Sequence, residues 1–142
     1  MYFKEYISKS EKDTERIGCE LFNLLGYPSF VALYGDLGAG KTAFVRGMVS
    51  SFDNEAIVTS PTYNIVNKYS FGNKSFYHFD MYRITDDDDL YSVGFYDYID
   101  NGILVCEWCE NIPYAIPESY WRVFVFKCED EHTRRITVEF IE

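Results

Sequence analysis

The sequence has few basic residues for its length. Its 142 residues include 13 Lys and Arg against 23 Asp and Glu, which gives a formal net charge of −10. Binding to a nucleic-acid backbone requires a positively charged surface, because Lys and Arg must neutralise the contacted phosphates. We therefore do not expect the chain to hold a nucleic acid by itself. The acidic composition instead favours a protein partner, or a small anion held in a local basic pocket.

Long apolar runs are also absent from the sequence. A helix that crosses a bilayer needs about 20 consecutive apolar residues, and no segment approaches that length. Residues 1–9 lack the apolar core of a signal peptide. We therefore expect a cytoplasmic protein that does not associate with a membrane.

The cysteines are not spaced for metal binding. Of the four cysteines, Cys106 and Cys109 form a C-x-x-C, but no second pair of Cys or His stands at zinc-ligand spacing. Cys106 lies inside a continuous apolar run, where cysteine behaves as a small core residue. We therefore expect neither a disulfide scaffold nor a zinc site.

No internal repeat or low-complexity linker divides the chain. Its length is sufficient to bury a hydrophobic core, and 47% of the residues are apolar, which is ordinary for a globular protein. We predict a single domain over residues 1–142.

What the sequence does contain is a phosphate-binding motif. Residues 35–42 read Gly-Asp-Leu-Gly-Ala-Gly-Lys-Thr and satisfy G-x-x-x-x-G-K-[ST] at every fixed position. Five β-prone apolar residues precede the motif at 30–34, and a segment of helical periodicity follows it. A strand, a glycine-rich loop and a helix in that order are typical of a nucleotide phosphate site.

The residue types of the motif suit a bound phosphate. Gly35, Gly38 and Gly40 allow a positive φ and a close approach of the backbone to a ligand. The backbone amides can then point inward as an anion-binding nest at the positive end of the following helix. Lys41 supplies a mobile charge for the β- and γ-phosphates, and the Thr42 hydroxyl is placed to ligate Mg²⁺.

The remaining periodicity predicts a sheet with helices on its faces. The expected elements are an opening strand at 2–7, a helix capped by Ser10 and ended at 26–28, a short strand at 56–58, a hairpin with arms at 63–71 and 75–82, a helical region from 86, a strand at 103–107 and two final strands at 121–126 and 135–141. We predict a three-layer α/β fold of the P-loop NTPase type, with a mixed, mostly parallel central sheet of about six or seven strands. A nucleotide would lie at the carboxyl ends of the central strands.

Two carboxylates are candidates for the chemistry. Asp80 lies on an otherwise apolar and aromatic strand, where a carboxylate is costly to bury without a cation or hydrogen-bond donors. Its partner is either Arg83 or a magnesium ion or activated water. Glu107 follows four apolar residues, as the strand-end carboxylate of a Walker B element does; the alternative is a surface glutamate that ends a buried strand. Asp86–Asp89, by contrast, are interpreted as the solvated first turn of a helix.

A turn of hydroxyl-bearing residues at 59–63 is a further candidate. Pro61 restrains its own φ and the residue before it, so the turn has a defined shape. It follows the first strand–loop–helix unit, where nucleotide hydrolases carry switch-like segments. Thr62 therefore belongs either to a plain turn or to a segment that contacts the γ-phosphate or positions water.

Taken together, these motifs resemble the TsaE (YjeE) family of bacterial P-loop ATPases. The resemblance rests on the phosphate loop, Ser-Pro-Thr-Tyr at 60–63, His-Phe-Asp-Met-Tyr-Arg at 78–83, Gly94 and Glu-Trp at 107–108, in matching order and spacing. The phosphate loop alone would be generic, whereas the whole set is specific. One departure is Cys109, because family members usually follow Glu-Trp with proline.

The resemblance implies a subunit that binds and hydrolyses ATP with Mg²⁺, weakly when alone. It implies a role in forming threonylcarbamoyladenosine in tRNA next to the anticodon, together with TsaB and TsaD. TsaD would carry the transfer chemistry, and this subunit would reset the complex between turnovers. The tRNA would be reached only indirectly through the complex, which suits the acidic composition.

The same resemblance implies roles for individual residues. Lys41 would bind phosphate, Thr42 and Glu107 would hold Mg²⁺, and Asp80 would belong to the metal or water shell. The implied catalytic set is Lys41, Asp80 and Thr62. The implied nucleotide-binding set is Ser10, Thr14, Asp36, Leu37, Gly38, Ala39, Gly40, Lys41, Thr42, Ala43, Trp108 and Arg134, with Arg135 as the alternative to Arg134.

Three rival functions remain open. A GTPase would select guanine with an N/T-K-x-D motif, and the nearest match, residues 67–70, lacks the aspartate. A small-molecule kinase needs an acceptor pocket and usually an arginine-bearing lid, and neither available segment, 85–99 or 111–118, is basic. A non-catalytic adaptor would bind ATP with Mg²⁺ but would not hydrolyse it.

Overall fold

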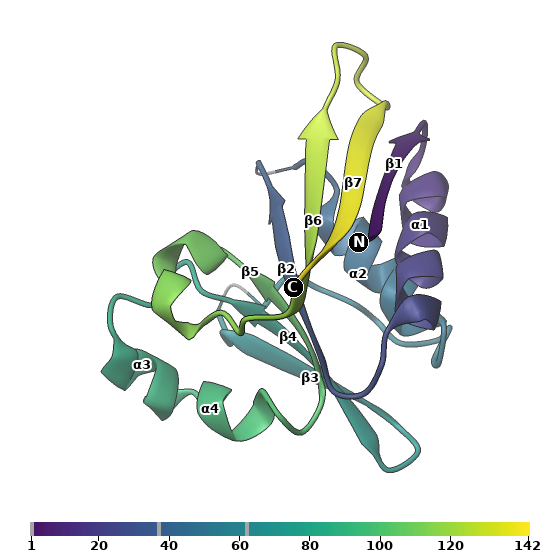
Figure 1. Ribbon diagram of the computed structural model, residues 1–142. Coiled ribbons are helices and arrows are strands. Elements are labelled where there is room, and N and C mark those ends of the chain that lie inside the picture. The colour runs from purple at the N-terminus through teal and green to yellow at the C-terminus, as the bar shows by residue number, and fades with distance from the viewer. Residues whose placement is uncertain (1, 37, 62) are drawn as a thin grey trace.

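The structure is a computed structural model that describes residues 2–36, 38–61 and 63–142. Leu37 and Thr62, which the sequence predicts to lie in the site, fall outside the described residues. The described residues form a seven-stranded sheet in the order β1-β7-β6-β2-β5-β4-β3 (Figure 1). Its strands are β1 (Tyr2–Ser8), β2 (Ser29–Gly35), β3 (Val66–Phe71), β4 (Lys74–Asp80), β5 (Ile103–Glu107), β6 (Tyr120–Lys127) and β7 (Arg134–Ile141).

The centre of the sheet is parallel and its sides are antiparallel. Neighbours among β6, β2, β5 and β4 pair in parallel, whereas β3 at one side and β7 and β1 at the other pair antiparallel. The predicted mixed sheet is therefore confirmed, with its parallel part in the middle. Because β2, β4 and β5 run in the same direction, their carboxyl ends meet at one edge of the sheet.

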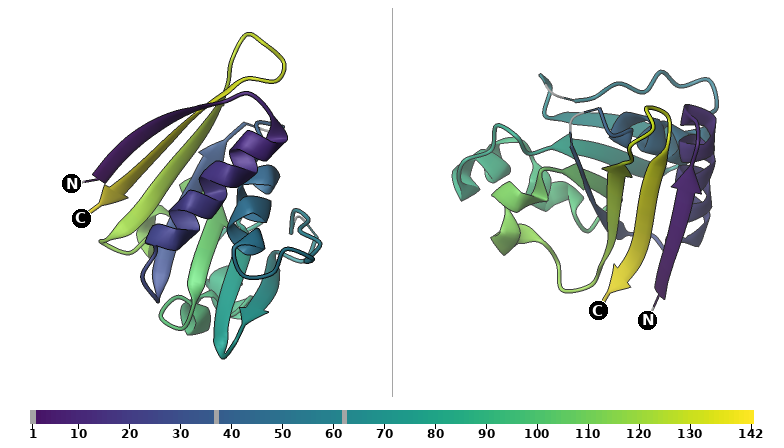
Figure 2. Two further views of the ribbon diagram at one scale, coloured as in Figure 1. Left: turned by 90° about the vertical axis from the view of Figure 1, so that its right-hand side faces the viewer. Right: turned by 90° about the horizontal axis from the view of Figure 1, so that it is seen from above.

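Helices cover both faces of this sheet, so the predicted three-layer arrangement is confirmed. The helices α1 (Glu11–Leu24) and α2 (Lys41–Ser50) lie side by side against one face (Figure 2). The other face carries α3 (Asp87–Ser92), α4 (Phe95–Tyr98) and the 3₁₀ turns η1 (Cys109–Asn111) and η2 (Pro113–Ala115). Within the described part of the chain, every helix is too short or too polar to cross a membrane.

Each central strand contributes to two cores, because its side chains alternate between the faces. In β2, Val31 and Leu33 pack toward α1 and α2, whereas Phe30 and Ala32 pack toward α3 and α4. All four are buried, which explains why the strand reads as a continuous apolar run instead of an alternating one. Cys106 of β5 is also fully buried, in agreement with its interpretation as a core residue.

The N-terminus of α1 is fixed by the predicted cap. The Ser10 hydroxyl accepts a hydrogen bond from the Asp13 backbone N–H at 3.1 Å. Asp13 in turn accepts one from the Lys9 backbone N–H at 3.0 Å, a reciprocal arrangement close to a capping box. Asp86 caps α3 in the same manner, so the aspartate run forms a helix start, as predicted.

Two local predictions are wrong. Residues 56–58 form no strand; Val58 packs into the core beside α2, whereas Ile57 is 86% exposed. Val58, with Ala56 packed against the same cluster, covers the core without joining the sheet. The hairpin begins at Val66 and not at Tyr63, because the φ of Ile65 is 68°, which interrupts the extended backbone. The second arm ends at Asp80, so Tyr82 lies beyond the strand.

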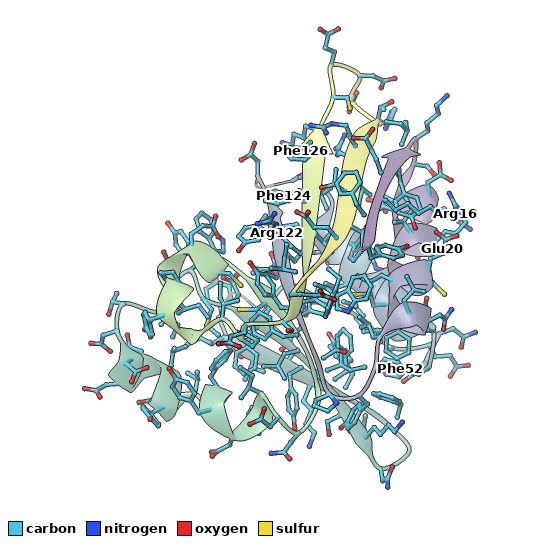
Figure 3. All side chains as sticks on the ribbon, in the orientation of Figure 1. Arg16, Glu20, Phe52, Arg122, Phe124 and Phe126 are labelled. Atoms are coloured by element: carbon cyan, nitrogen blue, oxygen red, sulfur yellow. The ribbon has the colours of Figure 1, made fainter. Side chains whose placement is uncertain are left out.

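The described helices leave the β6, β7 and β1 part of the second face open. Figure 3 shows Arg122, Phe124 and Phe126 along one side of β6. The rings of Phe124 and Phe126 stack with centroids 5.6 Å apart, and Arg122 lies 5.7 Å above the Phe124 ring. Arg122 Nε donates a 2.7 Å hydrogen bond to Glu139 Oε1 of β7. Local pairs of this kind allow the aromatic row to remain partly exposed.

The packing of α1 against α2 depends on two glycines. A Cβ at Gly18 would lie 2.1 Å from the Phe44 carbonyl oxygen, and a Cβ at Gly47 would lie 1.9 Å from that of Glu15. The two backbones are therefore in direct contact. The first turn of α1 then lies beside the phosphate loop. A Cβ at Gly40 of this loop would lie 3.9 Å from Thr14 Cγ2 of α1.

We expect Gly47→Ala to lower the free energy of unfolding by on the order of 3 kcal/mol, because the helices must separate to admit the methyl group. The matched control is Gly26→Ala, since a Cβ at Gly26 would meet no heavy atom within 4 Å. Its effect should stay within about 1 kcal/mol. Urea unfolding measures both values. Equal effects of the two substitutions would contradict the close contact.

Candidate functional site

The phosphate loop joins the end of β2 to the start of α2, as the motif predicts. Gly40 is the N-cap of α2 with a φ of 112°, and Gly38 has a φ of 77°. Side chains with a Cβ rarely adopt these values, which is why the motif requires glycine there. Arg134 fastens the loop from β7: its Nε donates to the Ala39 carbonyl at 2.8 Å and its Nη2 to the Gly38 carbonyl at 3.4 Å.

The loop opens on a cavity of about 690 Å³ at the carboxyl end of the central strands. This volume is in the range of pockets for ligands of nucleotide size. The cavity is lined by Ser10, Glu11, Thr14, Gly38, Ala39, Gly40, Lys41, Thr42, Ala43, Arg46, Ser60, Asp80, Tyr82, Glu107, Trp108, Glu131, His132 and Arg134. All the predicted site residues that the structure describes are among them except Asp36.

Asp36 is the predicted residue that the structure leaves out of the cavity. Its side chain is exposed, and its carbonyl accepts the Ala39 amide at 3.0 Å within the loop. Arg135, the alternative to Arg134, also points elsewhere. It pairs with Glu5 at 3.2 Å and lies 4.3 Å above the Phe126 ring. The alternation of β7 therefore places Arg134 at the cavity and Arg135 on the open sheet face.

The two predicted carboxylates are neighbours at the end of the sheet. Asp80 closes β4 and is directly opposite Glu107, which closes β5, and both side chains are buried. Burial raises the pKa of Asp80, and the charge of Glu107 adds to this effect, while the backbone N–H of Tyr82 opposes it by donating to Oδ1 at 2.9 Å. Arg83 lies 5.3 Å above the Tyr63 ring, and among the ion pairs of the described residues there is none between Arg83 and Asp80.

Glu107 lies at the centre of a buried charged group. Its Oε1 is 3.5 Å from Lys41 Nζ, and its Oε2 is 2.5 Å from His78 Nε2. Burial alone would raise the pKa of Glu107, but the hydrogen bond with His78 and the charge of Lys41 outweigh it and hold this pKa below its usual value. Lys41 Nζ also lies 5.8 Å from the Trp108 ring. Glu107 is thus poised as an anion beside the phosphate loop.

The donor atoms of this region fit a magnesium ion. Thr42 supplies a hydroxyl, and Asp80 and Glu107 supply carboxylates, which are the hard oxygen ligands that Mg²⁺ prefers. Within the described residues no group of three or more His, Cys, Asp or Glu side chains is arranged to hold a metal by itself. Mg²⁺ is usually held by one or two carboxylates together with substrate phosphates.

Several cavity residues were not predicted from the sequence. Arg46 is one helical turn beyond Thr42 on α2, and this spacing could have indicated it. Its guanidinium lies 3.6 Å from Glu15 and 4.0 Å from Glu11 of α1. His132 lies in the turn between β6 and β7, and no local pattern places that turn over the cavity. The contact of His78 with Glu107 joins residues 29 apart in the chain, so it has no local signal either.

The fold and this loop together define the class of the protein. A glycine-rich loop that connects a central parallel strand to a helix N-terminus is the arrangement of P-loop NTPase-like proteins, which bind nucleotides. Comparison with known sequences then gives the family. Residues 8–136 match the family described as threonylcarbamoyl adenosine biosynthesis protein TsaE, and the chain belongs to this TsaE family.

Curated relatives with the name tRNA threonylcarbamoyladenosine biosynthesis protein TsaE agree with this assignment. The protein of Haemophilus influenzae is 42% identical over 90 residues, which cover 63% of this chain and 57% of the relative. The protein of Rickettsia conorii is 35% identical over 75% of this chain and 62% of the relative. For Treponema pallidum the identity is 34%, over 93% of this chain and 97% of the relative. The matched part is thus less than two thirds of the first two relatives.

A solved structure shows the same fold. The crystal structure of YdiB from Bacillus subtilis superimposes with a TM-score of 0.78 and covers 99% of this chain and 86% of that chain. The two sequences are 24% identical, so the similarity concerns the fold.

We expect Arg134→Ala to weaken the binding of a nucleoside triphosphate by at least about tenfold, because the carbonyls of the phosphate loop lose their charged donor. Arg135→Ala is the matched control, since Arg135 is the next residue along the chain and faces away from the cavity. Isothermal titration calorimetry measures both affinities. An equal loss in both variants would show that Arg134 does not act through the loop.

Proposed function

We propose that the chain binds ATP with Mg²⁺ in this cavity and hydrolyses it during the formation of threonylcarbamoyladenosine in tRNA. The observation that carries the proposal is the meeting of Lys41, Glu107 and Asp80 at the N-terminus of α2. One cation and two buried carboxylates surround the point where the motif would place the terminal phosphates. Membership of the TsaE family supports the pathway.

The triphosphate would bind along the phosphate loop. The backbone amides in the first turn of α2 have no partner within the helix, and they are available to phosphate oxygens. Lys41 would turn from Glu107 to the β- and γ-phosphates, which carry more negative charge than one carboxylate. Arg134 would hold the loop in shape from behind.

Thr42 and Glu107 would hold the metal, with Asp80 beside them. When bound, Mg²⁺ would neutralise charge that develops on the phosphate oxygens during transfer. Asp80 would orient the attacking water, because the Tyr82 N–H fixes one of its oxygens at 2.9 Å and keeps the carboxylate in place. Trp108, next to Glu107, would cover the site from the solvent side.

ATP is favoured over GTP. The incomplete guanine motif at residues 67–70 lies within the edge strand β3, and the cavity lining contains none of its described residues. Lys68 of this segment lies 5.9 Å from the Tyr77 ring. The base of ATP would lie toward Ser10 and Thr14 at the start of α1, where the cavity continues.

The proposed partners are TsaB and TsaD, with tRNA reached only through them. A net charge of −10 supports this division, because the chain has no excess of cations with which to hold the tRNA backbone. Hydrolysis would be slow in the isolated chain and would reset the complex between rounds of modification. We also propose that residues 1–142 act as one domain and that the protein is cytoplasmic, where tRNA is modified.

We expect Lys41→Ala to weaken Mg²⁺-ATP binding by about 10–100-fold, because charge-assisted bonds to phosphate are lost. Lys74→Ala is the control, since Lys74 begins β4, at the far end of the strand from Asp80, and lies over the Tyr27 ring. Calorimetry with ATP and with GTP measures affinity and base preference together. If Lys41→Ala binds ATP with unchanged affinity, the phosphate loop does not bind the phosphates of the nucleotide.

Measuring turnover of ATP distinguishes a hydrolysing subunit from a non-catalytic adaptor that only binds ATP. The wild-type chain is combined with TsaB, TsaD and unmodified tRNA, and phosphate release and repeated modification are followed. We expect both with wild type and neither with Lys41→Ala. ATP binding with no phosphate release in the complete mixture would support the adaptor and contradict hydrolysis. Failure to bind those partners would contradict the proposed pathway role.

A further inference from the structure

His78 is a fully buried polar residue that the proposed function has not used. It lies on β4 with an exposed fraction of 0%, two residues before Asp80 and on the same face of the strand. In the sheet it lies between Val105 of β5 and Asn67 of β3, one step behind the Asp80–Glu107 pair. Burial of its ring nitrogens costs free energy unless they are paired.

We propose that His78 is a positioning residue that holds the Glu107 carboxylate in the orientation needed for Mg²⁺. This inference rests on the proposed function. His78 Nε2 lies 2.5 Å from Glu107 Oε2, whereas Glu107 Oε1 faces Lys41 at the mouth of the cavity. The two oxygens are thus divided: His78 occupies the inner one, and the outer one remains available to a cation.

Glu107 is the hydrogen-bond partner of the His78 ring among the described residues. His78 Nδ1 is buried and has no hydrogen-bond partner in that part of the chain. An ionised carboxylate can only accept a hydrogen bond, so an N–H at His78 Nε2 donates to Glu107 Oε2.

His78 becomes more important for Glu107 when a nucleotide draws Lys41 away. Among the described residues, the polar side chains in contact with Glu107 are those of Lys41 and His78. If Lys41 moves to the phosphates, His78 is the partner that still holds the buried carboxylate. Hydrogen bonds of this kind behind a metal ligand fix its orientation and commonly change metal affinity by about 10–100-fold.

Two substitutions of similar polarity separate this role from simple core packing. The amide nitrogen of Gln at position 78 reaches the place of Nε2, whereas the shorter Asn reaches only the place of Nδ1. His78→Gln therefore keeps a donor for Glu107, and His78→Asn removes it. Phe76→Leu is the stability control, because Phe76 is fully buried on the same face of β4, does not line the cavity and bears no polar atom.

The experiment measures the affinity for a non-hydrolysable ATP analogue by calorimetry as Mg²⁺ is varied, and again in EDTA. For His78→Asn we expect the Mg²⁺ concentration at half-maximal enhancement to rise by about 10–100-fold. Affinity in EDTA should stay within about twofold of wild type. His78→Gln should restore most of the Mg²⁺ dependence, and Phe76→Leu should leave it unchanged.

Other outcomes would overturn the proposal. If His78→Asn keeps the wild-type Mg²⁺ dependence, or loses affinity equally with and without Mg²⁺, His78 does not act through Glu107. If His78→Asn does not fold, His78→Gln is compared with Glu107→Gln, which replaces the carboxylate itself with an amide. A shift in the Mg²⁺ dependence of His78→Gln as large as that of Glu107→Gln would show that the donor to Glu107 is not retained, and would overturn the proposal. If Mg²⁺ does not change the nucleotide affinity of the wild-type chain, the metal role and the proposed function are both wrong. This result can be told apart from a failure of the His78 proposal alone, because it is seen without any substitution.

Discussion

The buried contact of Lys41 with Glu107 is the interaction on which the site depends. It joins the first residue of α2 to the last residue of β5, across the glycine loop that separates helix from sheet. Because both side chains are largely buried, their contact offsets part of the loss of hydration of each. In the proposed function, a phosphate group that attracts Lys41 would also free Glu107 for a cation. Anion and metal binding would then be coupled through one ion pair.

The remainder of the fold keeps this contact in place. The parallel pairing of β4 with β5 sets Asp80 beside Glu107, and β2 directs the loop to the same edge. Gly18 and Gly47 let α1 and α2 touch, which brings the start of α1 against the loop. From the other side, Arg134 ties the loop to β7. The site is thus built from segments that are distant in sequence and converge at the end of the sheet.

The parts of the site with local signals could be predicted from the sequence. The loop at 35–42 and the strand ending at Glu107 have fixed spacing and apolar flanks, and the fold class follows from the order of strands and helices. The choice between Arg134 and Arg135 required the register of β7, since a shift of one residue exchanges the faces. The partner of His78 required the pairing of β4 with β5. The strand predicted at 56–58 is wrong because an apolar residue such as Val58 can also be buried in the core without forming a strand.

The most direct test is a crystal structure of the chain with a non-hydrolysable ATP analogue and Mg²⁺. We expect Lys41 Nζ to leave Glu107 and to contact the β- and γ-phosphates. The hydroxyl of Thr42 and the outer oxygen of Glu107 would face the metal, and His78 Nε2 would keep its hydrogen bond to the inner oxygen. Nucleotide bound outside the cavity, or Lys41 still paired with Glu107 beside a bound triphosphate, would contradict the account.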